Sequence, residues 1–427
     1  SGVRSGDFLM TISRLANTGD LMAGNLPYRM TDQPAEGWGW LDENSIVGPY
    51  VKKYFRGNGR EGQTLNDKYV CFIFPTHDKG FPFQNWDDSQ WWLSEFIGED
   101  RNVFLSGTDQ NKGQEFEVIR NGKMDVLLIG AGGAGGGSYH SNDGASGYAG
   151  GGGGAGQYLL TNGHEFTSDV YKTYVGCGTM LEVGSYSNLS YRGRGGDSVL
   201  QKKKVFAGLR ANMDYESPQF LDKEATTELI AYGGGSGGVG RQDPSNNERM
   251  MPGASGGGAP VVQSYIFRDK RAPAIEDGVT GYSGGESSYT TEGAGGGGGF
   301  AGPGVSGNRY TEPRATGNDW QTPGETDPMN DRNRGGAGGP GVEFNFWGEE
   351  QTACAGGGGG CYAGTKGIGG THGGGDGASG HNSRGEDGKS WGSGGGGSGV
   401  HGGAQASYAS QGAHGLVAIR YKLEELA

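Results

Sequence analysis

Large apolar and aromatic residues occur in short runs in this chain, separated by long stretches of small and polar residues. Residues 68–74 form a β-branched and aromatic run that ends at Pro75, a pattern typical of a strand. Residues 124–129 are a second apolar run, and residues 415–421 close the chain with side chains of the buried type. These runs predict three strands, whereas residues 89–97 indicate a short helix.

Glycine divides the chain into two parts. Only 15 of the 94 glycines fall in residues 1–122, and five of the eight tryptophans lie there as well. Because aromatic side chains bury large areas, we expect a small conventional core in this part. Residues 123–427 hold the other glycines, most of them in dense blocks at 130–137, 147–156, 233–240, 253–258, 293–304, 335–341, 356–375 and 392–403. The sequence therefore predicts a domain boundary near residue 122.

Inserts rich in polar and aromatic residues separate the glycine blocks, at 205–230, 260–292, 305–334 and 342–353. In the third insert, residues 308–334 include Tyr310 and Trp320 but no glycine pair and no apolar periodicity that could form a core. We expect this segment to be an exposed loop that folding does not require.

Glycine makes up 94 of the 427 residues, against an average of about 7%. Runs such as 151–154 exclude the strict repeat of collagen, and an aromatic content of 10% excludes a simple linker. Glycine has no side chain to bury, yet its N–H and C=O groups must find partners. Left-handed glycine helices with three residues per turn can approach one another closely enough to supply them. The blocks therefore predict a lattice of such helices, with the inserts emerging as loops at its ends.

Charge and hydropathy exclude several classes of partner. The formal net charge of −13 argues against nucleic acid, because phosphate binding relies on clustered Lys and Arg. The basic run at 202–204 is interpreted as exposed loop charge. The apolar stretches, such as 126–129, are far too short for a bilayer span, and no export signal is recognisable. We expect a soluble protein without membrane insertion.

One motif resembles a cofactor site. Residues 124–129 followed by Gly130, Gly132 and Gly135 give a strand and a G-x-G-x-x-G pattern, typical of dinucleotide binding. Such a site also needs a helix directly after the glycines to hold the pyrophosphate. Residues 136–147 contain too much glycine to sustain a helix. We therefore expect no cofactor.

The four cysteines, Cys71, Cys177, Cys354 and Cys361, are too few for a disulfide framework in so long a chain. An extended run between Cys354 and Cys361 would span roughly 22 Å, so these two pair only if the run turns back. Whether they pair stays open. Their spacing to the downstream histidines matches no usual zinc pattern, and no catalytic triad signature is recognisable. We expect neither a metal site nor an enzyme.

The order of elements in residues 123–421 resembles the glycine-rich domain of phage tail proteins, which also occurs in a divergent form beside the extracellular part of anaplastic lymphoma kinase. The shared pieces lie at 125–133, 150–160, 174–178, 195–200, 231–235, 335–342 and 415–421. The resemblance implies polyglycine-II helices beside a small β-sheet that contains strands 125–129, 171–175 and 416–421. The expected fold class is thus mainly β and irregular, a polyglycine-II helix bundle packed with a small β-sheet and preceded by a small N-terminal mixed domain.

The chain is also similar in style to the glycine-rich adhesins at the long-fibre tips of T-even phages, whose loops contact host surface molecules. This resemblance implies a bacteriophage virion structural protein, a tail-fibre or tail-tip component that presents loops for host attachment. Residues 1–122 would then serve virion attachment or assembly. The candidate receptor or partner contacts are aromatic residues of the inserts: Tyr282, Tyr289, Tyr310, Trp320, Phe344, Phe346 and Trp347.

Other interpretations stay open at this point. The same aromatic residues could cap the lattice or contact a neighbouring subunit. A purely structural virion component, such as a fibre joint, a collar or a head or tail decoration, is the alternative function, and a polysaccharide depolymerase is a third. The expected partners are other virion proteins and a glycan or outer-membrane protein of the host surface, with a homo-oligomer as an open alternative. The expected location is the virion, assembled in the host cytoplasm.

Overall fold

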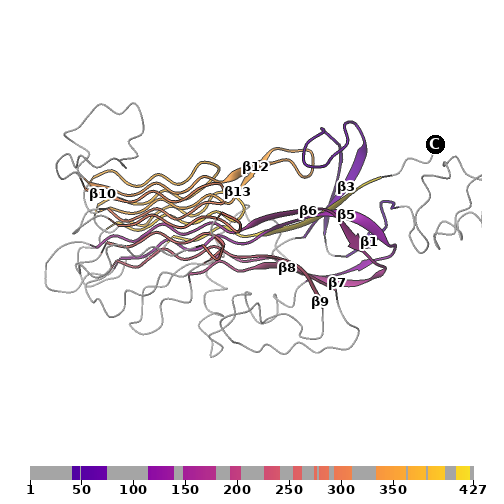
Figure 1. The fold of residues 1–427 in the computed structure, drawn as a ribbon, viewed down its shortest axis with the longest axis horizontal. Coiled ribbons are helices and arrows are strands. Elements are labelled where there is room, and N and C mark those ends of the chain that lie inside the picture. Colours follow the sequence, from indigo (N-terminus) through magenta and orange to yellow (C-terminus); the bar gives the residue numbers. More distant parts are fainter. Residues whose placement is uncertain are drawn as a thin grey trace, which may run out of the picture.

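The computed structural model describes residues 41–48, 50–74, 114–138, 148–178, 193–202, 226–240, 253–261, 274–276, 278–287, 293–309, 333–361, 364–380, 383–399 and 410–423. These ranges contain fourteen strands and no helix. Ten of the strands form two five-stranded sheets, which lie together at one end of an elongated molecule (Figure 1).

The first sheet is antiparallel and has the strand order β2-β3-β14-β5-β6. Its strands are β2 (Val51–Arg56), β3 (Lys68–Phe74), β14 (Leu416–Lys422), β5 (Gly122–Ile129) and β6 (Tyr158–Phe166). The last strand of the chain, β14, lies at the centre, with Arg420 opposite Cys71 of β3 on one side and Asp125 of β5 on the other. Strands that are far apart in the sequence thus pair in one sheet.

The second sheet is also antiparallel and has the order β1-β4-β7-β8-β9. Its strands are β1 (Ile46–Val47), β4 (Gln114–Val118), β7 (Asp169–Tyr174), β8 (Ser198–Lys202) and β9 (Thr226–Ala231). The two sheets approach each other along β6 of the first sheet and β9 of the second. There the N–H of Gln157 donates to the carbonyl of Tyr232 (2.8 Å), and His164 faces Glu228 with 3.7 Å between Nε2 and Oε2.

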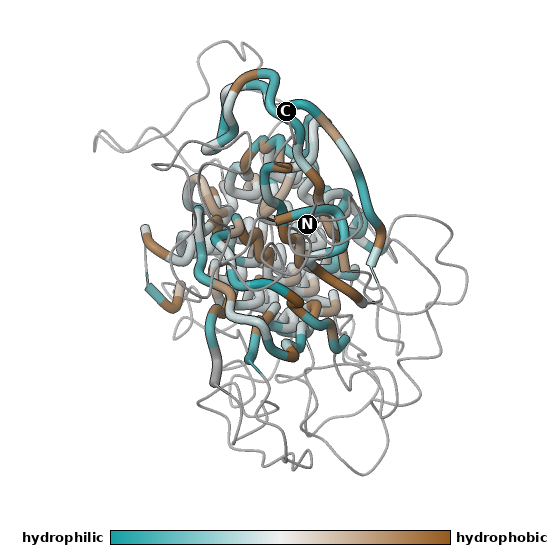
Figure 2. The backbone as a smooth tube through the Cα atoms, turned by 90° about the vertical axis from the view of Figure 1, so that its right-hand side faces the viewer, coloured by the Kyte–Doolittle hydropathy of each residue, from teal (hydrophilic) through white to brown (hydrophobic). Residues whose placement is uncertain are grey.

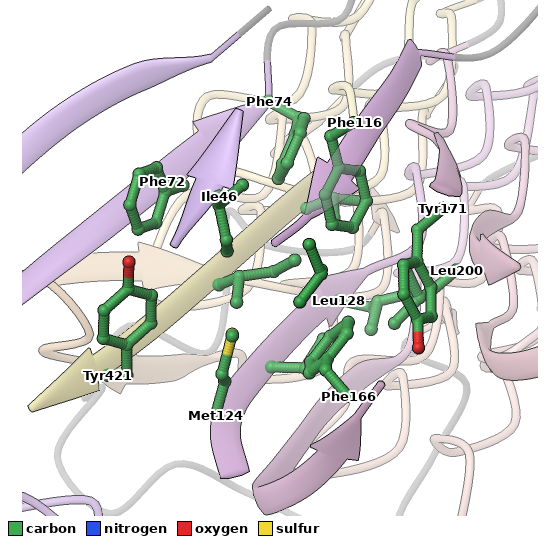
Figure 3. Packing of buried hydrophobic residues seen from close by; sticks show 14 of the residues in the cluster. Ile46, Phe72, Phe74, Phe116, Met124, Leu128, Phe166, Tyr171, Leu200 and Tyr421 are labelled. Atoms are coloured by element: carbon green, nitrogen blue, oxygen red, sulfur yellow. The ribbon is translucent and has the colours of Figure 1, made fainter. Parts of the chain in front are cut away.

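A hydrophobic core fills the space between the two sheets. Its large side chains come from both sheets and include Ile46, Phe72, Phe74, Phe116, Met124, Leu128, Phe166, Tyr171, Leu200 and Tyr421 (Figure 3). Phe116 packs against Phe74 and Tyr171, with ring centroids 5.0 and 5.6 Å apart. Each such side chain contributes about 1.5–3 kcal/mol when it leaves water. This core is the conventional hydrophobic centre of the molecule.

Extended glycine-rich segments continue from the sheets and run side by side along the long axis (Figure 1). Seen along that axis, the segments are stacked beside and above one another (Figure 2). We call this part the glycine block; it comprises residues 130–138, 148–157, 193–197, 232–240, 253–261, 278–287, 293–309, 333–341, 353–361, 364–380, 383–399 and 410–415.

Segment 148–157 lies at the centre of the block, where six other segments surround it. Between residues 150 and 155, successive N–H groups donate in a repeat of three residues to segments 391–399, 232–240 and 293–300. The carbonyls of the same residues accept from segments 130–138, 253–261 and 353–361. The donor–acceptor distances are 2.7 to 3.0 Å, so every backbone polar group between residues 150 and 155 has a partner, as burial demands.

This close packing leaves no space for a side chain at residues 150–154 of the central segment. A Cβ at Gly152 would lie 2.0 Å from the carbonyl oxygen of Gly357, and one at Gly358 would lie 2.2 Å from that of Gly367. Larger residues occupy the outermost segments, where Val305 and Ile368 are exposed. Glycine is therefore required by the distance between neighbouring backbones.

Two short antiparallel strand pairs accompany the block. They are β10 (Asn308–Arg309) with β11 (Asn333–Arg334), and the hairpin of β12 (Val342–Phe344) with β13 (Gln351–Ala353). The hairpin supplies side chains to a second buried cluster, which lies on the other face of the first sheet. This cluster contains Cys71, Ile73, Leu127, Ile129, Phe344, Phe346, Trp347, Trp391 and Leu416. The first sheet is thus covered on both faces.

The fold class expected from the sequence is wrong. The described residues contain no helix, and their regular structure consists of antiparallel sheets, so a polyglycine-II helix bundle is not what the structure shows. The sheet part is larger than one small sheet, and β1, β2 and β3 belong to it, so no mixed domain precedes it among the described residues. The expectation included one small sheet beside the glycine segments, but it missed the second sheet and the core that the two sheets bury together.

Most of the strands predicted from the sequence are present, but one of them lies in a different sheet from the one expected. Residues 68–74 form β3, and the runs at 125–129 and 416–421 lie in β5 and β14, as predicted. The strand expected at 171–175 corresponds to β7, but it lies in the second sheet and does not join β5 and β14. The helix expected at 89–97 falls outside the described residues.

Candidate functional site

The end of the glycine block away from the two sheets is where most of its segments leave the described part of the chain. Segments end there at Ser138, Gly240, Val261, Ser287, Arg309, Cys361, Gly380 and Gly399. The chain re-enters there at Tyr148, Gly293, Asn333, Gly364 and Ser383. We call this the loop-bearing end; in Figure 1 the label β10 marks it.

Direct contacts hold one group of these residues together. Ser138 forms a parallel bridge with Gly240, and its buried hydroxyl donates to the carbonyl of Gly399 over 2.7 Å. The N–H of Gly240 donates in turn to the carbonyl of Gly137 (3.0 Å). Three segments that are far apart in the sequence therefore end at the same level.

A second group of residues is joined in the same way. Cys361 forms bridges with Gly293 and with Ser379. Nearby, a small buried cluster of three side chains ties another set of segments together; its members are Ala149, Val261 and Ala294. These contacts hold the segment ends together at the loop-bearing end.

The predicted contact residues fall into three groups. Tyr289, Tyr310 and Trp320 belong to connections that start and finish at the loop-bearing end, and they lie outside the described residues. Tyr282 is half-buried in segment 278–287, where its N–H donates to the carbonyl of Gly299 (3.2 Å).

The third group contains Phe344, Phe346 and Trp347. Their side chains are 2%, 0% and 4% exposed, and they pack in the cluster on the first sheet. The structure thus places them in the interior, where no partner reaches them. The sequence could not separate the two roles, because an aromatic residue in an insert fits both a core and a contact surface.

Sequence reasoning missed a buried charge in the first sheet. Arg420 of β14 is fully buried, and its Nε donates to Oδ2 of Asp125 over 3.0 Å. Its other nitrogens donate to the carbonyls of Phe346 (3.0 Å) and Glu61, and the guanidinium lies 4.1 Å from the centroid of the Phe346 ring. Arg420 therefore links the sheet, the turn after β2 and the β12–β13 hairpin. The only signal in the sequence is one Arg in an apolar run.

The cysteines are free and buried. Cys354 and Cys361 do not pair, which answers the question left open by the sequence. Burial raises the pKa of Cys71 and of Cys354 well above the ordinary value. These two thiols therefore stay protonated near neutral pH, the form that is a poor nucleophile and metal ligand.

In the G-x-G-x-x-G pattern, the glycine N–H groups already have hydrogen-bond partners within the glycine block. The N–H groups of Gly132 and Gly135 donate to the carbonyls of Ala413 (2.8 Å) and Ser410 (3.1 Å). Residues 130–137 are buried and extended, without the helix that dinucleotide binding needs. The donors that would hold a pyrophosphate are thus used within the protein.

Ion pairs join the outer segments of the block on one side. Lys366 lies 2.9 Å from Asp376 and 3.2 Å from Glu386, which also pairs with Lys389. Burial disfavours the ionised form of Asp376, but the N–H of Gly369 and the ammonium of Lys366 outweigh it, so its pKa lies below the ordinary value. The hydrogen bond from Lys389 likewise lowers the pKa of Glu386. These charges connect segments 364–380 and 383–399.

Within the described ranges, no group of three or more His, Cys, Asp or Glu side chains is arranged to hold a metal ion. The same ranges include no helix that could cross a membrane.

Comparison with known proteins concerns the glycine block and the sheets. A family model described as a glycine-rich domain matches residues 110–422. No curated protein matches the chain. The matched range begins just before β4 and ends with the last residue of β14, so it takes in the whole block and every strand except β1, β2 and β3. Since this match covers well over half of the sequence, the chain belongs to the glycine-rich domain family.

Proposed function

We propose that this chain is a structural protein of a bacteriophage particle, a tail-fibre or tail-tip component that carries attachment loops on a rigid glycine block. The observation that supports a display role is the loop-bearing end, where eight segments leave the described chain on the side opposite the sheets. The connections at this end contain Tyr289, Tyr310 and Trp320. The phage assignment rests on the order of elements in residues 123–421.

A protein that displays loops needs a scaffold whose structure stays the same when the sequence or length of the loops varies. In the centre of the block each backbone group is bonded to a neighbouring segment, and at the sheet end Arg420 joins three elements. Changes in loop length alter the closure entropy only weakly, so such a support accepts different connections. Surface loops on a fixed scaffold are a common place for binding residues.

The sheet end is suited to attachment to the particle. The Tyr421 hydroxyl donates to the carbonyl of Asp42 (2.6 Å), and the N–H of Leu423 donates to the carbonyl of Lys68 (2.8 Å). Both ends of the described chain therefore lie at the sheets, away from the loop-bearing end. In this proposal residues 1–122, which supply β1, β2 and β3 at this end, serve assembly with other virion proteins.

A loop exchange tests the proposal. Residues 310–332 are replaced by a short Gly/Ser turn, with the β10–β11 pair kept intact, and binding of the purified protein to host bacteria is measured. We expect unchanged thermal unfolding and loss of most cell binding. The matched control replaces residues 203–225, a connection of equal length that starts at β8 and ends at β9, and should keep binding.

Other outcomes decide between functions. Binding to particle proteins but never to cells would support a purely structural component and contradict attachment. Release of sugar from capsular polysaccharide would support an enzyme. Antibody labelling of intact particles, viewed by electron microscopy, would locate the chain, and labelling away from the tail would contradict the tail assignment.

A further inference from the structure

We propose that the glycine block is a load-bearing element, which carries tension between the loop-bearing end and the two sheets by loading its hydrogen bonds in shear. The direction of the load rests on the proposed function, because attachment would pull on the loop-bearing end. The resistance itself is a property of the block.

The hydrogen bonds of the block run across its long axis. Between residues 150 and 155, each N–H and each carbonyl is bonded to one of six surrounding segments, which run along the axis (Figures 1 and 2). A force along the axis slides segment 148–157 past its neighbours, so these bonds must break together. A force across the axis separates one segment from the next, so bonds break in sequence at lower force.

The load has a continuous path into the sheets. Segment 130–138 continues from β5, segment 148–157 leads into β6, and segment 410–415 leads into β14. In the sheet, β14 is held between β3 and β5 by antiparallel pairing on both sides, and these bonds are also perpendicular to the strands. The chain direction therefore stays the same from block to sheet, and shear continues there.

The outer segments are the ones that a load would peel first, since they have neighbours on fewer sides. On one side of the block, Lys366 reaches across to Asp376 and Glu386. On the sheet, the β12–β13 hairpin is held by Arg420 through the carbonyl of Phe346. Side chains thus hold one outer edge of the block and the β12–β13 hairpin in place.

Single-molecule pulling in two directions tests the proposal. All four native thiols are buried, so introduced surface cysteines can be coupled selectively. The axial variant combines Thr365→Cys at the loop-bearing end with Lys422→Cys at the end of β14. The transverse variant combines Val305→Cys with Arg384→Cys, on outer segments that are linked through several intervening ones. The exposed residue Ser379 offers a second axial attachment point, as Ser379→Cys, if the first variant folds poorly.

We expect a severalfold higher unfolding force for the axial variant at the same loading rate, with the block lost in a single event. The transverse variant should lose its segments in steps at lower force. An axial force equal to or below the transverse force would overturn the proposal. Because the measurement uses purified protein without any receptor, loss of the attachment function would leave its result unchanged, and the two failures can be distinguished.

Discussion

Positions at the centre of the glycine block and positions at its surface differ in how much space they leave for a side chain. Gly152 has the carbonyl oxygen of Gly357 where a Cβ would stand, at 2.0 Å. Ala337 lies on an outer segment and is half-buried, with room for a side chain. At this scale, the distance to the next backbone decides which residue a position accepts.

Replacing Gly152 by Val should abolish folding or lower the stability severely. The branched side chain forces neighbouring segments apart and leaves N–H and C=O groups unpaired, at about 1–3 kcal/mol each. The measurement is thermal unfolding together with the yield of folded protein, and Ala337→Val is the control that should remain near the wild type. Equal stability of Gly152→Val and the wild type would show that the central segment is not packed as described.

His164 gives the molecule a pH dependence where the two sheets meet. Burial lowers the pKa of His164 below its ordinary value, although Glu228 and Glu165 oppose the shift. The unfolded chain therefore takes up the proton first. The contribution of His164 to stability is complete above the ordinary histidine pKa of about 6.5 and is lost as the pH falls below it.

We expect the substitution His164→Gln to flatten the dependence of stability on pH in this window. Denaturant unfolding of the variant and the wild type at a series of pH values measures the difference in slope. Parallel curves for the two proteins would mean that His164 titrates alike in the folded and unfolded states.

At the scale of elements, the β12–β13 hairpin shows why local patterns were insufficient. Its aromatic residues, among them Phe346, occupy an insert between glycine blocks, and the sequence analysis assigned them to contact with a partner. They are buried because the hairpin lies on the first sheet, where Arg420 holds the carbonyl of Phe346. That position depends on β14, which follows much later in the chain, so no local pattern could indicate it.

The Arg420→Met variant should be destabilised by about 3–5 kcal/mol, because the substitution takes the cation away from the Asp125 carboxylate and leaves its Oδ2 and two carbonyls without the donor that Arg420 supplies. Lys422→Met is the control on the same strand. Its exposed pair with Asp67 should be worth less than about 1 kcal/mol. Denaturant unfolding measures both, and equal losses in the two variants would contradict the central role of Arg420.

For the molecule as a whole, sequence patterns located the strands at 68–74, 125–129 and 416–421 because β-branched and aromatic runs are local signals. They did not give the pairing of β14 between β3 and β5, because it joins residues at opposite ends of the chain. They also missed the second sheet, whose short strands carry weaker signals. For the candidate site, the described ends of the 305–334 insert lie at the loop-bearing end, whereas the aromatic residues of the 342–353 insert are buried in a core.

The central segment has a consequence for how this backbone exchanges hydrogen with water. The six neighbours that leave no room for a Cβ at residues 150–154 also leave none for solvent. Amide protons there can be replaced by deuterium only when whole segments separate, as in the most protected strands of a sheet. Glycine, which elsewhere gives a chain its greatest conformational freedom, is thus the residue at the positions outside the sheets where we expect the slowest exchange.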